Sequence, residues 1–467
     1  MSITTSLVAI VKKFVAPALP QPTPEYDVNY FQQFNNVLRL YFNQLDQLLG
    51  QIVTTTLGTD TNPVYIAFSD GEVDAFGRLR VSNPYTLFDS QARYASDSAF
   101  DTSTASGGTS TFNTNQSSTS LSVTTTNGSS VVRQTYRYFP YQPGKSLLVL
   151  ATFCMGAGKT NLTQRLGYYD VNNGIYFQQS GTTLGFAIRS NTTGSPVDTV
   201  VTQANWNGDK MDGTGTSGLT LDVTKTQIFY TDMEWLGVGI VRVGFVIGGK
   251  YINCHTFYNA NTTNTTVYMT TATLPVRYEI FNSGVTASSS TLTQICCSVV
   301  SEGGYEETSQ QYWARNTAAI SVPTTNLFVP MVSIRLNSSH LGAVVLPAII
   351  SVLPLTTANY EVIICRNVGL TGASWVTGTF QDVDYDISAT AFTSQPSGTQ
   401  ICQVDYLTST AQSSSNSVAS IGYKWDLQLG VSLAGSSDVI TLGIRTIGAS
   451  GVANSAIGSL GFYDLTV

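Results

Sequence analysis

The chain has 467 residues, of which only 11% are charged, and its formal net charge is −7 at pH 7. Ordinary globular proteins carry about 25% charged residues, so the polar surface here must come mainly from Ser, Thr, Asn, Gln and Gly. The 22 basic residues are scattered, which argues against a nucleic-acid partner. No apolar run approaches the roughly 20 residues of a membrane span. Because its two histidines, His255 and His340, offer few groups for proton transfer near neutral pH, we predict that the chain is not an enzyme.

Residues 1–26 are predicted to form an arm and a linker. Their apolar run is split by Lys12 and Lys13 and lacks a basic leader, and the QPTP that follows favours an extended conformation. We interpret the arm as a segment that docks on a neighbouring chain. The alternative is a cryptic membrane or export signal.

Residues 27–54 carry the one strong helical pattern. Apolar side chains recur three and four residues apart over about three heptads, with Asp27 suited to cap the helix and Gly50 near its end. Such a face needs an apolar partner, either an identical helix in a homo-oligomer or the protein's own sheet. We expect self-association, with a trimer preferred, although the spacing alone does not fix the number of chains. The predicted oligomerisation residues, called the apolar seam below, are Phe31, Phe34, Leu38, Tyr41, Leu45, Leu48 and Ile52.

From residue 55 to 305 the pattern changes to short strands separated by tight turns. Asn127-Gly128, Pro143-Gly144, Asn173-Gly174 and Gly248-Gly249 each separate strand-like runs. These dipeptides favour reversals, because Gly accepts a positive φ and Asn tolerates it. Regular strands without intervening amphipathic helices predict an antiparallel two-sheet sandwich of jelly-roll type.

Residues 306–317 are predicted as a connector and residues 318–467 as a second sandwich. Glu302, Glu306 and Glu307 cluster at this boundary in an otherwise neutral stretch. Because no ladder of Asp and Asn surrounds them, we interpret them as a solvated linker face rather than a catalytic or calcium site. The predicted fold class is therefore all-β, with two antiparallel, jelly-roll-like β-sandwich domains preceded by an N-terminal amphipathic helix.

Six cysteines lie mostly in apolar, strand-like runs. They form no C-x-x-C pair, and only the adjacent Cys254 and His255 bring a histidine close in sequence. We expect free thiols that pack as small apolar side chains. Neither a metal site nor a cofactor is predicted.

The stretch FCMGAGKTN, residues 153–161, suggests a phosphate-binding loop at first sight. Such a loop needs Gly, four further residues and then Gly-Lys-Ser/Thr, and Phe153 stands where the first Gly would be. The residues that follow alternate like a strand, whereas a phosphate-binding loop leads into a helix. We predict instead a connection between strands, with Gly156 and Gly158 at the bend and Lys159 facing solvent.

Other catalytic arrangements find little support. A Ser-His-Asp site would have to use His255 or His340, and neither lies in a recognisable nucleophile context. The carboxylates of Asp384 and Asp386 could serve glycoside cleavage, but pairs this close in sequence more often decorate turns. Sugar binding is a stronger alternative, because aromatic faces stack on sugars and Asn and Asp bind their hydroxyls.

Residues 70–94, DGEVDAFGRLRVSNPYTLFDSQARY, resemble a motif of virion structural proteins of large double-stranded DNA phages and viruses. Several stretches of residues 133–304, including RLGYYDVNNGIYF, resemble its continuation, and LRLYFNQLDQ, residues 38–47, resembles the N-terminal helix of such proteins. The resemblance implies a location in the virion and contacts with other virion proteins. It supplies no catalytic residues.

The function expected from these observations is that of a structural component of a virus particle, either a fibre, a spike, a tail or a minor capsid protein. It would oligomerise through the apolar seam and display its β-domains. The alternative is a receptor- or glycan-binding fibre protein that contacts glycans on the host surface. A polysaccharide-degrading enzyme is a third, more distant reading of the same fold.

Overall fold

The computed structural model describes residues 28–56, 74–75, 83–306, 309–378, 382–409, 417–420, 424–448 and 453–466. The chain divides into two units, Met1–Phe68 and Ser69–Val467. The described part of the first unit is the helix α1 (Val28–Thr56), and that of the second is built from antiparallel strands. The predicted arm, residues 1–26, and the predicted helix cap Asp27 lie outside the described residues.

The helix α1 is uninterrupted over 29 residues. It continues past Gly50, where the sequence suggested an end, to Thr56. A single glycine costs a helix only about 1 kcal/mol relative to alanine, so it is a weak terminator on its own. The whole apolar seam therefore lies on one continuous helix.

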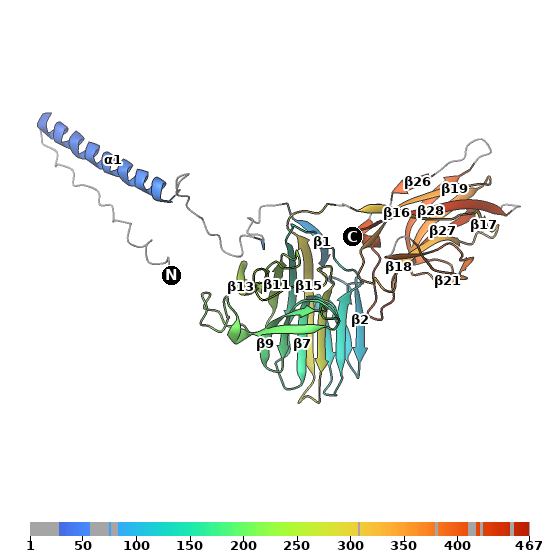
Figure 1. The fold of residues 1–467 in the computed structure, drawn as a ribbon, viewed down its shortest axis with the longest axis horizontal. Helices are drawn as coiled ribbons and strands as arrows, with labels where there is room; N and C mark the ends of the chain where they lie inside the picture. The colour runs from blue at the N-terminus through green and yellow to red at the C-terminus, as the bar shows by residue number, and fades with distance from the viewer. Residues whose placement is uncertain are drawn as a thin grey trace. The chain divides into compact units, whose positions relative to one another are not determined.

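The first sandwich consists of two antiparallel sheets, drawn in blue-green to yellow in Figure 1. Its strands are β1 (Tyr85–Ser90), β2 (Phe100–Ala105), β3 (Thr109–Asn113), β4 (Ser118–Val123), β5 (Ser130–Thr135), β6 (Leu147–Cys154), β7 (Leu162–Tyr169), β8 (Gly174–Ser180), β9 (Thr183–Ser190), β10 (Val197–Thr202), β11 (Gln227–Met233), β12 (Val241–Ile247), β13 (Lys250–Phe257), β14 (Val276–Asn282) and β15 (Ser290–Ser301), with short 3-10 helices at η1 (Thr114–Gln116) and η2 (Gln203–Asn205). The eight-stranded sheet has the order β13-β12-β11-β6-β15-β4-β3, with β1 also paired to β15. The seven-stranded sheet has the order β10-β9-β8-β7-β14-β5-β2.

The second sandwich, drawn in orange and red in Figure 1, is also built from antiparallel strands. They are β16 (Gln310–Arg315), β17 (Ile320–Val322), β18 (Val329–Leu336), β19 (Val345–Pro354), β20 (Asn359–Arg366), β21 (Leu370–Thr371), β22 (Val376–Thr377), β23 (Val383–Asp386), β24 (Ala391–Phe392), β25 (Ile401–Thr408), β26 (Ser417–Ser420), β27 (Val439–Ile447) and β28 (Asn454–Asp464), with 3-10 helices η3 (Gly398–Gln400) and η4 (Lys424–Leu427). One sheet has the order β16-β28-β19-β26, with β17 also on β28, and the other has the order β22-β23-β18-β27-β20-β25; β21 and β24 form a separate pair. The prediction of an all-β chain with antiparallel sandwiches behind one N-terminal helix is confirmed.

The boundary between the sandwiches differs from the expected solvated connector. Strand β16 lies inside residues 306–317 and pairs with β28, with Gln310 opposite Asp464. Glu302 is buried at 6% exposure, whereas Glu306 is exposed. The strand was missed because a partner more than a hundred residues away creates it, and its own alternation is too short to signal a strand.

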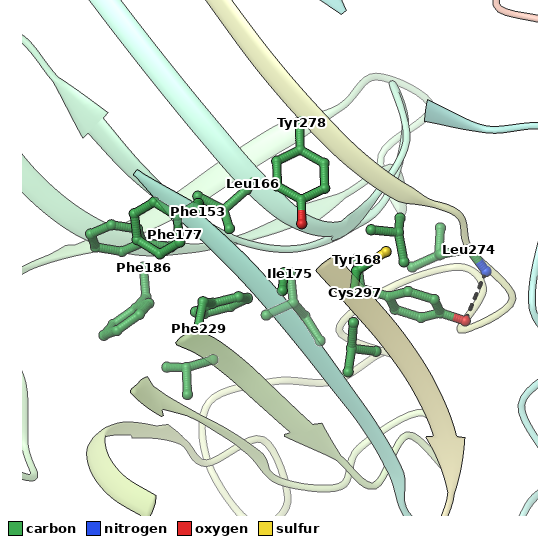
Figure 2. Close-up of a cluster of buried hydrophobic side chains, with 14 of the residues drawn as sticks. Phe153, Leu166, Tyr168, Ile175, Phe177, Phe186, Phe229, Leu274, Tyr278 and Cys297 are labelled. Atoms are coloured by element: carbon green, nitrogen blue, oxygen red, sulfur yellow. Dashed lines mark hydrogen bonds between the residues drawn. The ribbon is translucent and has the colours of Figure 1, made fainter. Parts of the chain in front are cut away.

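Aromatic rings from both sheets fill the core of the first sandwich, as Figure 2 shows. Phe153 on β6 and Phe229 on β11 meet Phe177 on β8 and Phe186 on β9, and all four rings are fully buried. The centroids of the Phe177 and Phe186 rings lie 5.4 Å apart. Burying such rings contributes more free energy of folding per residue than any other side-chain class, which suits a chain with few charges.

One polar group enters this core with its hydrogen bonds satisfied. The hydroxyl of Tyr168, a residue with 0% exposure, lies 2.8 Å from the Phe139 carbonyl and 2.9 Å from the Ala272 carbonyl. It also accepts a hydrogen bond from the backbone N–H of Leu274 at 3.1 Å, the dashed line in Figure 2. The hydroxyl therefore ties the loop before β14 to the core without an unpaired buried group.

The two sandwiches also bond to each other directly, at the chain that leaves β5. The backbone N–H of Val431 donates to the Tyr136 carbonyl at 2.8 Å, and the side chain of Gln428 donates to the Tyr138 carbonyl at 2.7 Å. A guanidinium nitrogen of Arg137 donates to the carbonyl of Trp425 at 2.9 Å. Backbone groups supply at least one end of each bond, so the junction depends on the course of the chain.

Candidate functional site

The apolar seam occupies one face of α1, because residues three and four apart share a face of a helix. The described side chains of Phe34, Leu38 and Tyr41 are partly exposed, and Phe31 is 45% exposed. The ring of Tyr30 stacks on that of Phe34, with centroids 6.2 Å apart. The remaining seam positions, whose side chains lie outside the described residues, are Leu45, Leu48 and Ile52.

No side chain of residues 29–43, the part of α1 whose burial is described, is buried. Leu40 and Phe42, which lie beside the seam, are 59% and 55% exposed. An amphipathic helix gains most of its stability by packing its apolar stripe against another surface. The described stripe is thus a partly exposed apolar surface.

A second candidate site is a pocket of about 530 Å³ at one edge of the first sandwich, called the edge pocket below. It lies where β10, the outermost strand of one sheet, and β13, the outermost strand of the other, contribute to the same cavity. The turn after β9 and residues 258–268 complete the wall. The lining residues are Ile188, Ser190, Thr192, Thr193, Val197, Thr199, His255, Thr256, Phe257, Tyr258, Asn259, Thr262, Thr263, Asn264, Thr266, Val267 and Tyr268.

The loop at residues 207–209 holds the outer edge of β13 in place. The side-chain amide of Asn207 donates to the Thr256 carbonyl and accepts from the Thr256 N–H, both at 2.8 Å. The backbone N–H groups of Gly208 and Asp209 donate to the carbonyls of Cys254 and Asn253, both at 2.9 Å. These four bonds imitate the pairing of a further strand and leave this stretch of edge closed to association.

His255 lies under the pocket with only 7% of its surface exposed. Burial lowers the pKa of His255 from 6.5 to about 4, so the ring is neutral at physiological pH. Its Nδ1 accepts a hydrogen bond from the Asn207 N–H at 3.2 Å, which places the ring proton on Nε2. Within the described part of the chain no group accepts a hydrogen bond from that Nε2–H.

Hydrogen bonds to neighbouring loops hold the wall at residues 258–268 in place. The side chain of Asn259, itself 7% exposed, donates to the Gly239 carbonyl at 2.7 Å. The hydroxyl of Thr262 donates to the carbonyl of Asn259 at 2.9 Å, and the N–H of Tyr268 donates to the carbonyl of Gly237 at 2.9 Å. The loop therefore has a defined shape before any ligand arrives.

Several polar groups of the pocket remain available. The hydroxyls of Thr199, Thr263 and Tyr258 make no hydrogen bond to the described residues. Tyr258 is 65% exposed, and the pocket also exposes Val197 at 53% and Val267 at 38%. The pocket thus offers an aromatic face beside uncharged donors and acceptors.

The sequence did not predict the edge pocket. Its polar residues come from two stretches of the chain, 190–199 and 255–268, and neither of them forms a spaced motif. The one local signal is the run NANTTNTT, residues 259–266, which follows a strand and is too long for a tight hairpin turn.

The predicted connection FCMGAGKTN does link two strands, β6 and β7, but one detail of it was wrong. Lys159 is partly buried, and its ammonium donates to the Ser288 hydroxyl at 2.8 Å and to the Ser289 carbonyl at 3.0 Å. These acceptors belong to a turn that precedes β15, which the sequence around Lys159 does not reveal. The lysine therefore ties two loops together instead of facing solvent.

The carboxylates weighed as a glycosidase pair are both structural. Asp384 accepts hydrogen bonds from the Thr377 hydroxyl at 2.7 Å and the Arg335 guanidinium at 3.2 Å. Asp386, 1% exposed, accepts from the Ser374 N–H at 2.8 Å and the Ser388 hydroxyl at 2.6 Å. Asp384 thus bonds the two strands that pair with β23, and Asp386 bonds the loops beside it.

All six cysteines are free thiols. Cys254, Cys297 and Cys365 are buried, whereas Cys402 is exposed on β25 and does not pack as a core residue. Among the described residues no group of His, Cys, Asp or Glu could hold a metal ion. Within the same residues, no helix is long and apolar enough to span a membrane.

The fold and these sites define an all-β protein of two antiparallel, jelly-roll-like sandwiches. No protein-family model matches the sequence, and no curated protein matches it. Several solved structures are similar in fold to part of the chain. A beta-1,3-glucanase from Mycobacterium marinum matches with a TM-score of 0.31 and 11% identity, covering 46% of this chain and 98% of the glucanase chain.

The carbohydrate recognition domain of Emp47p matches with a TM-score of 0.29 and 10% identity, covering 47% of this chain and 96% of that domain. A carbohydrate esterase from the Shiga toxin-encoding bacteriophage phi24B matches with a TM-score of 0.26 and 9% identity, covering 47% of this chain and 99% of the esterase chain. At such identities the similarity concerns the fold alone and assigns no activity.

Proposed function

We propose that the protein is a structural component of a virus particle that self-associates through the apolar seam and displays its two sandwiches. The observation that carries the proposal is α1 itself, one unbroken helix that bears every seam residue and whose described side chains are all at least partly exposed. The resemblance of residues 70–94 to virion structural proteins supports a location in the virion. A homo-oligomer, preferably a trimer, and other virion proteins are the proposed partners.

The composition and the packing support this role on physical grounds. A particle component has to resist unfolding and proteolysis outside a cell, and sheets joined by short turns around an aromatic core suit that demand. With 11% charged residues, the chain also presents few groups that resist desolvation at contacts with its neighbours.

The proposed role includes no catalysis. The carboxylates of Asp384 and Asp386 accept hydrogen bonds from neighbouring side chains, and the ring of His340 bonds the carboxylate of Asp382 at 2.7 Å. Binding of host-surface glycans, the alternative function expected from the sequence, is compatible with this assembly role and independent of it.

Self-association is tested by placing a charge in the seam. We expect Leu38→Asp and Leu45→Asp each to shift the full-length chain from oligomer to monomer, because an unpaired carboxylate in an apolar helix interface costs several kcal/mol. The mass in solution is measured by light scattering after gel filtration. Asn36→Asp, an exposed position outside the seam, is the matched control and should keep the wild-type mass.

A wild-type chain that is monomeric at micromolar concentration, or a Leu38→Asp variant with an unchanged mass, would refute assembly through α1. The virion location is tested separately. Purified particles of the source virus should contain the chain by mass spectrometry, and its two sandwiches should fit density in a map of the particle.

A further inference from the structure

We propose that the edge pocket is a binding site for an uncharged, hydroxyl-rich ligand, namely the end of a neutral saccharide. The inference goes beyond the structural role and does not depend on it. It rests on the chemistry of the pocket wall, which includes the ring of the buried His255, and on the hydrogen bonds that hold the surrounding loops.

The wall of the pocket carries no formal charge. None of the described lining residues is Asp, Glu, Lys or Arg, and the buried His255 ring is neutral. A phosphorylated, sulfated or sialylated ligand would therefore bury its negative charge without a counter-charge, which is costly. The same argument disfavours ligands with a free ammonium group.

The polar groups of the wall match the hydroxyls of a sugar. The hydroxyls of Thr199 and Thr263 both donate and accept, as a sugar hydroxyl does, and they make no hydrogen bond to the described residues. The carboxamide oxygen of Asn264 is a further acceptor, because only the nitrogen of that amide is engaged, at 3.4 Å from the Asn259 oxygen. The Nε2–H of His255 is a further donor. A ligand oxygen that accepts its hydrogen bond would replace the water that this group loses when the ligand binds.

An aromatic face accompanies these groups. Tyr258 is 65% exposed at the pocket, and Val197 and Val267 are exposed close by. A pyranose ring has one face of C–H groups and a rim of hydroxyls, so it can stack on the tyrosine while its rim meets the polar wall. A purely polar or purely apolar ligand would leave one half of this surface unused.

The size and rigidity of the pocket suit such a ligand. Its volume of about 530 Å³ lies within the roughly 300–1,000 Å³ of small-molecule pockets. Asn207 fixes the β13 side through a partly buried hydrogen bond, and Asn259 fixes the loop side through a buried one. Little conformational entropy is then lost when a ligand binds, which matters for weakly bound neutral sugars.

The test uses the full-length chain and a glycan array that carries neutral oligosaccharides ending in glucose, galactose, mannose or N-acetylglucosamine, together with sialylated and sulfated ones. We expect binding to a subset of the neutral glycans. The strongest binder is then titrated calorimetrically against Tyr258→Ala and Thr199→Val, and each change should weaken its affinity at least ~10-fold.

Tyr406→Ala is the matched control, because Tyr406 is 69% exposed on β25 of the other sandwich. It should bind like the wild type, and the melting temperatures of all three variants should stay close to that of the wild type, because every substituted side chain is exposed. Silence across the neutral glycans, binding only to the charged ones, or wild-type affinity in both Tyr258→Ala and Thr199→Val would overturn the proposal. Loss of oligomerisation in the seam variants would leave it untouched.

Discussion

His255 and Asp382 have pKa values that burial displaces in opposite directions. Burial lowers the pKa of His255 to about 4, because the charged imidazolium is poorly solvated in the protein. Burial also raises the pKa of Asp382 to about 6, assisted by the charge of Asp464 and opposed by His340. In each case the environment favours the neutral form of the side chain.

As the pH falls, the pKa shifts of His255 and Asp382 change the stability of the folded protein in opposite directions. An unfolded histidine titrates near pH 6.5, so as the pH falls from 6.5 to 4 the unfolded chain gains a proton that folded His255 does not, and stability is lost. An unfolded aspartate titrates near pH 4, so as the pH falls from 6 to 4 folded Asp382 gains a proton that the unfolded chain does not, and stability is gained. The cost of ionising Asp382 is therefore fully present above pH 6.

Asp382→Asn is expected to remove that cost. The variant should gain stability relative to the wild type at pH 7.5 and lose this advantage at pH 4.5, because the asparagine stays neutral and its carboxamide oxygen can still accept from the His340 ring. Melting temperatures at pH 4.5, 6.0 and 7.5 measure the difference. An equal effect of the substitution at all three pH values would contradict the raised pKa of Asp382.

The sequence did not reveal this group of side chains. Asp382, just before β23, and Asp464, at the end of β28, are separated by about eighty residues and belong to different sheets, and only the fold of the second sandwich brings them together. The same holds for Lys159 and its acceptors before β15. Residue types and their spacing define which contacts are chemically possible, whereas long-range strand pairing decides which of them form.

At the scale of the element, glycines at strand ends do two different things. Gly174 opens β8 with φ 141°, and a Cβ atom there would lie 2.1 Å from the Cβ of Tyr169. Gly181 lies in the turn after β8 with φ 62°, and a Cβ atom there would meet nothing within 4 Å. The first glycine is required for space and conformation, the second for conformation alone.

The pair therefore predicts unequal costs for the same substitution. Gly181→Ala should lower the free energy of unfolding by about 1 kcal/mol, the usual cost of a left-handed alanine. Gly174→Ala should lower it by about 3 kcal/mol or more, because the Tyr169 strand must also move. Urea unfolding of both variants measures the two values. Similar losses of unfolding free energy in the two variants would mean that the β7–β8 hairpin accommodates the added methyl group at residue 174 with little cost.

Helices and strands whose sequence has a clear periodicity were predictable. Features that arise only from pairing with another strand were not. The three-and-four spacing from Phe31 to Ile52 predicted a helix, and α1 is that helix. The Asn173-Gly174 and Gly248-Gly249 turns do join adjacent antiparallel strands. The bulge of β15, where Gln294 is opposite Phe153 and Cys297 is opposite Ala151 on β6, breaks the alternation of its burial pattern and has no signal in the sequence.

For the whole molecule, the junction between the sandwiches carries a prediction. Gln428 is 1% exposed, and its amide donates to the Tyr138 carbonyl across the junction. Gln428→Leu should lower the free energy of unfolding by about 1–3 kcal/mol by leaving that carbonyl unpaired. In calorimetry, the two sandwiches of the variant should also unfold in two separate transitions. In the wild type these transitions should lie closer together or coincide.

Gln403→Leu is the control for that experiment, since Gln403 on β25 bonds Asp405 within the second sandwich at 2.8 Å. It should leave the separation of the transitions unchanged. An unaltered calorimetric profile in Gln428→Leu would show that the junction does not couple the sandwiches. The sequence predicted the two sandwiches without their junction, because the backbone carbonyls that accept its hydrogen bonds carry no residue-type signal.

The position of β28 in its sheet determines when during synthesis that sheet can form. This strand lies between β16 and β19, so neither neighbour can complete its sheet until residue 464 has been synthesised. The first sandwich is complete once β15 ends at Ser301, and it can fold while translation continues. At about 5–20 residues per second, the apolar β19 then waits roughly 5–20 s for its partner. That interval is when the nascent chain is most exposed to aggregation, and a chaperone that acts on this protein would be most useful then.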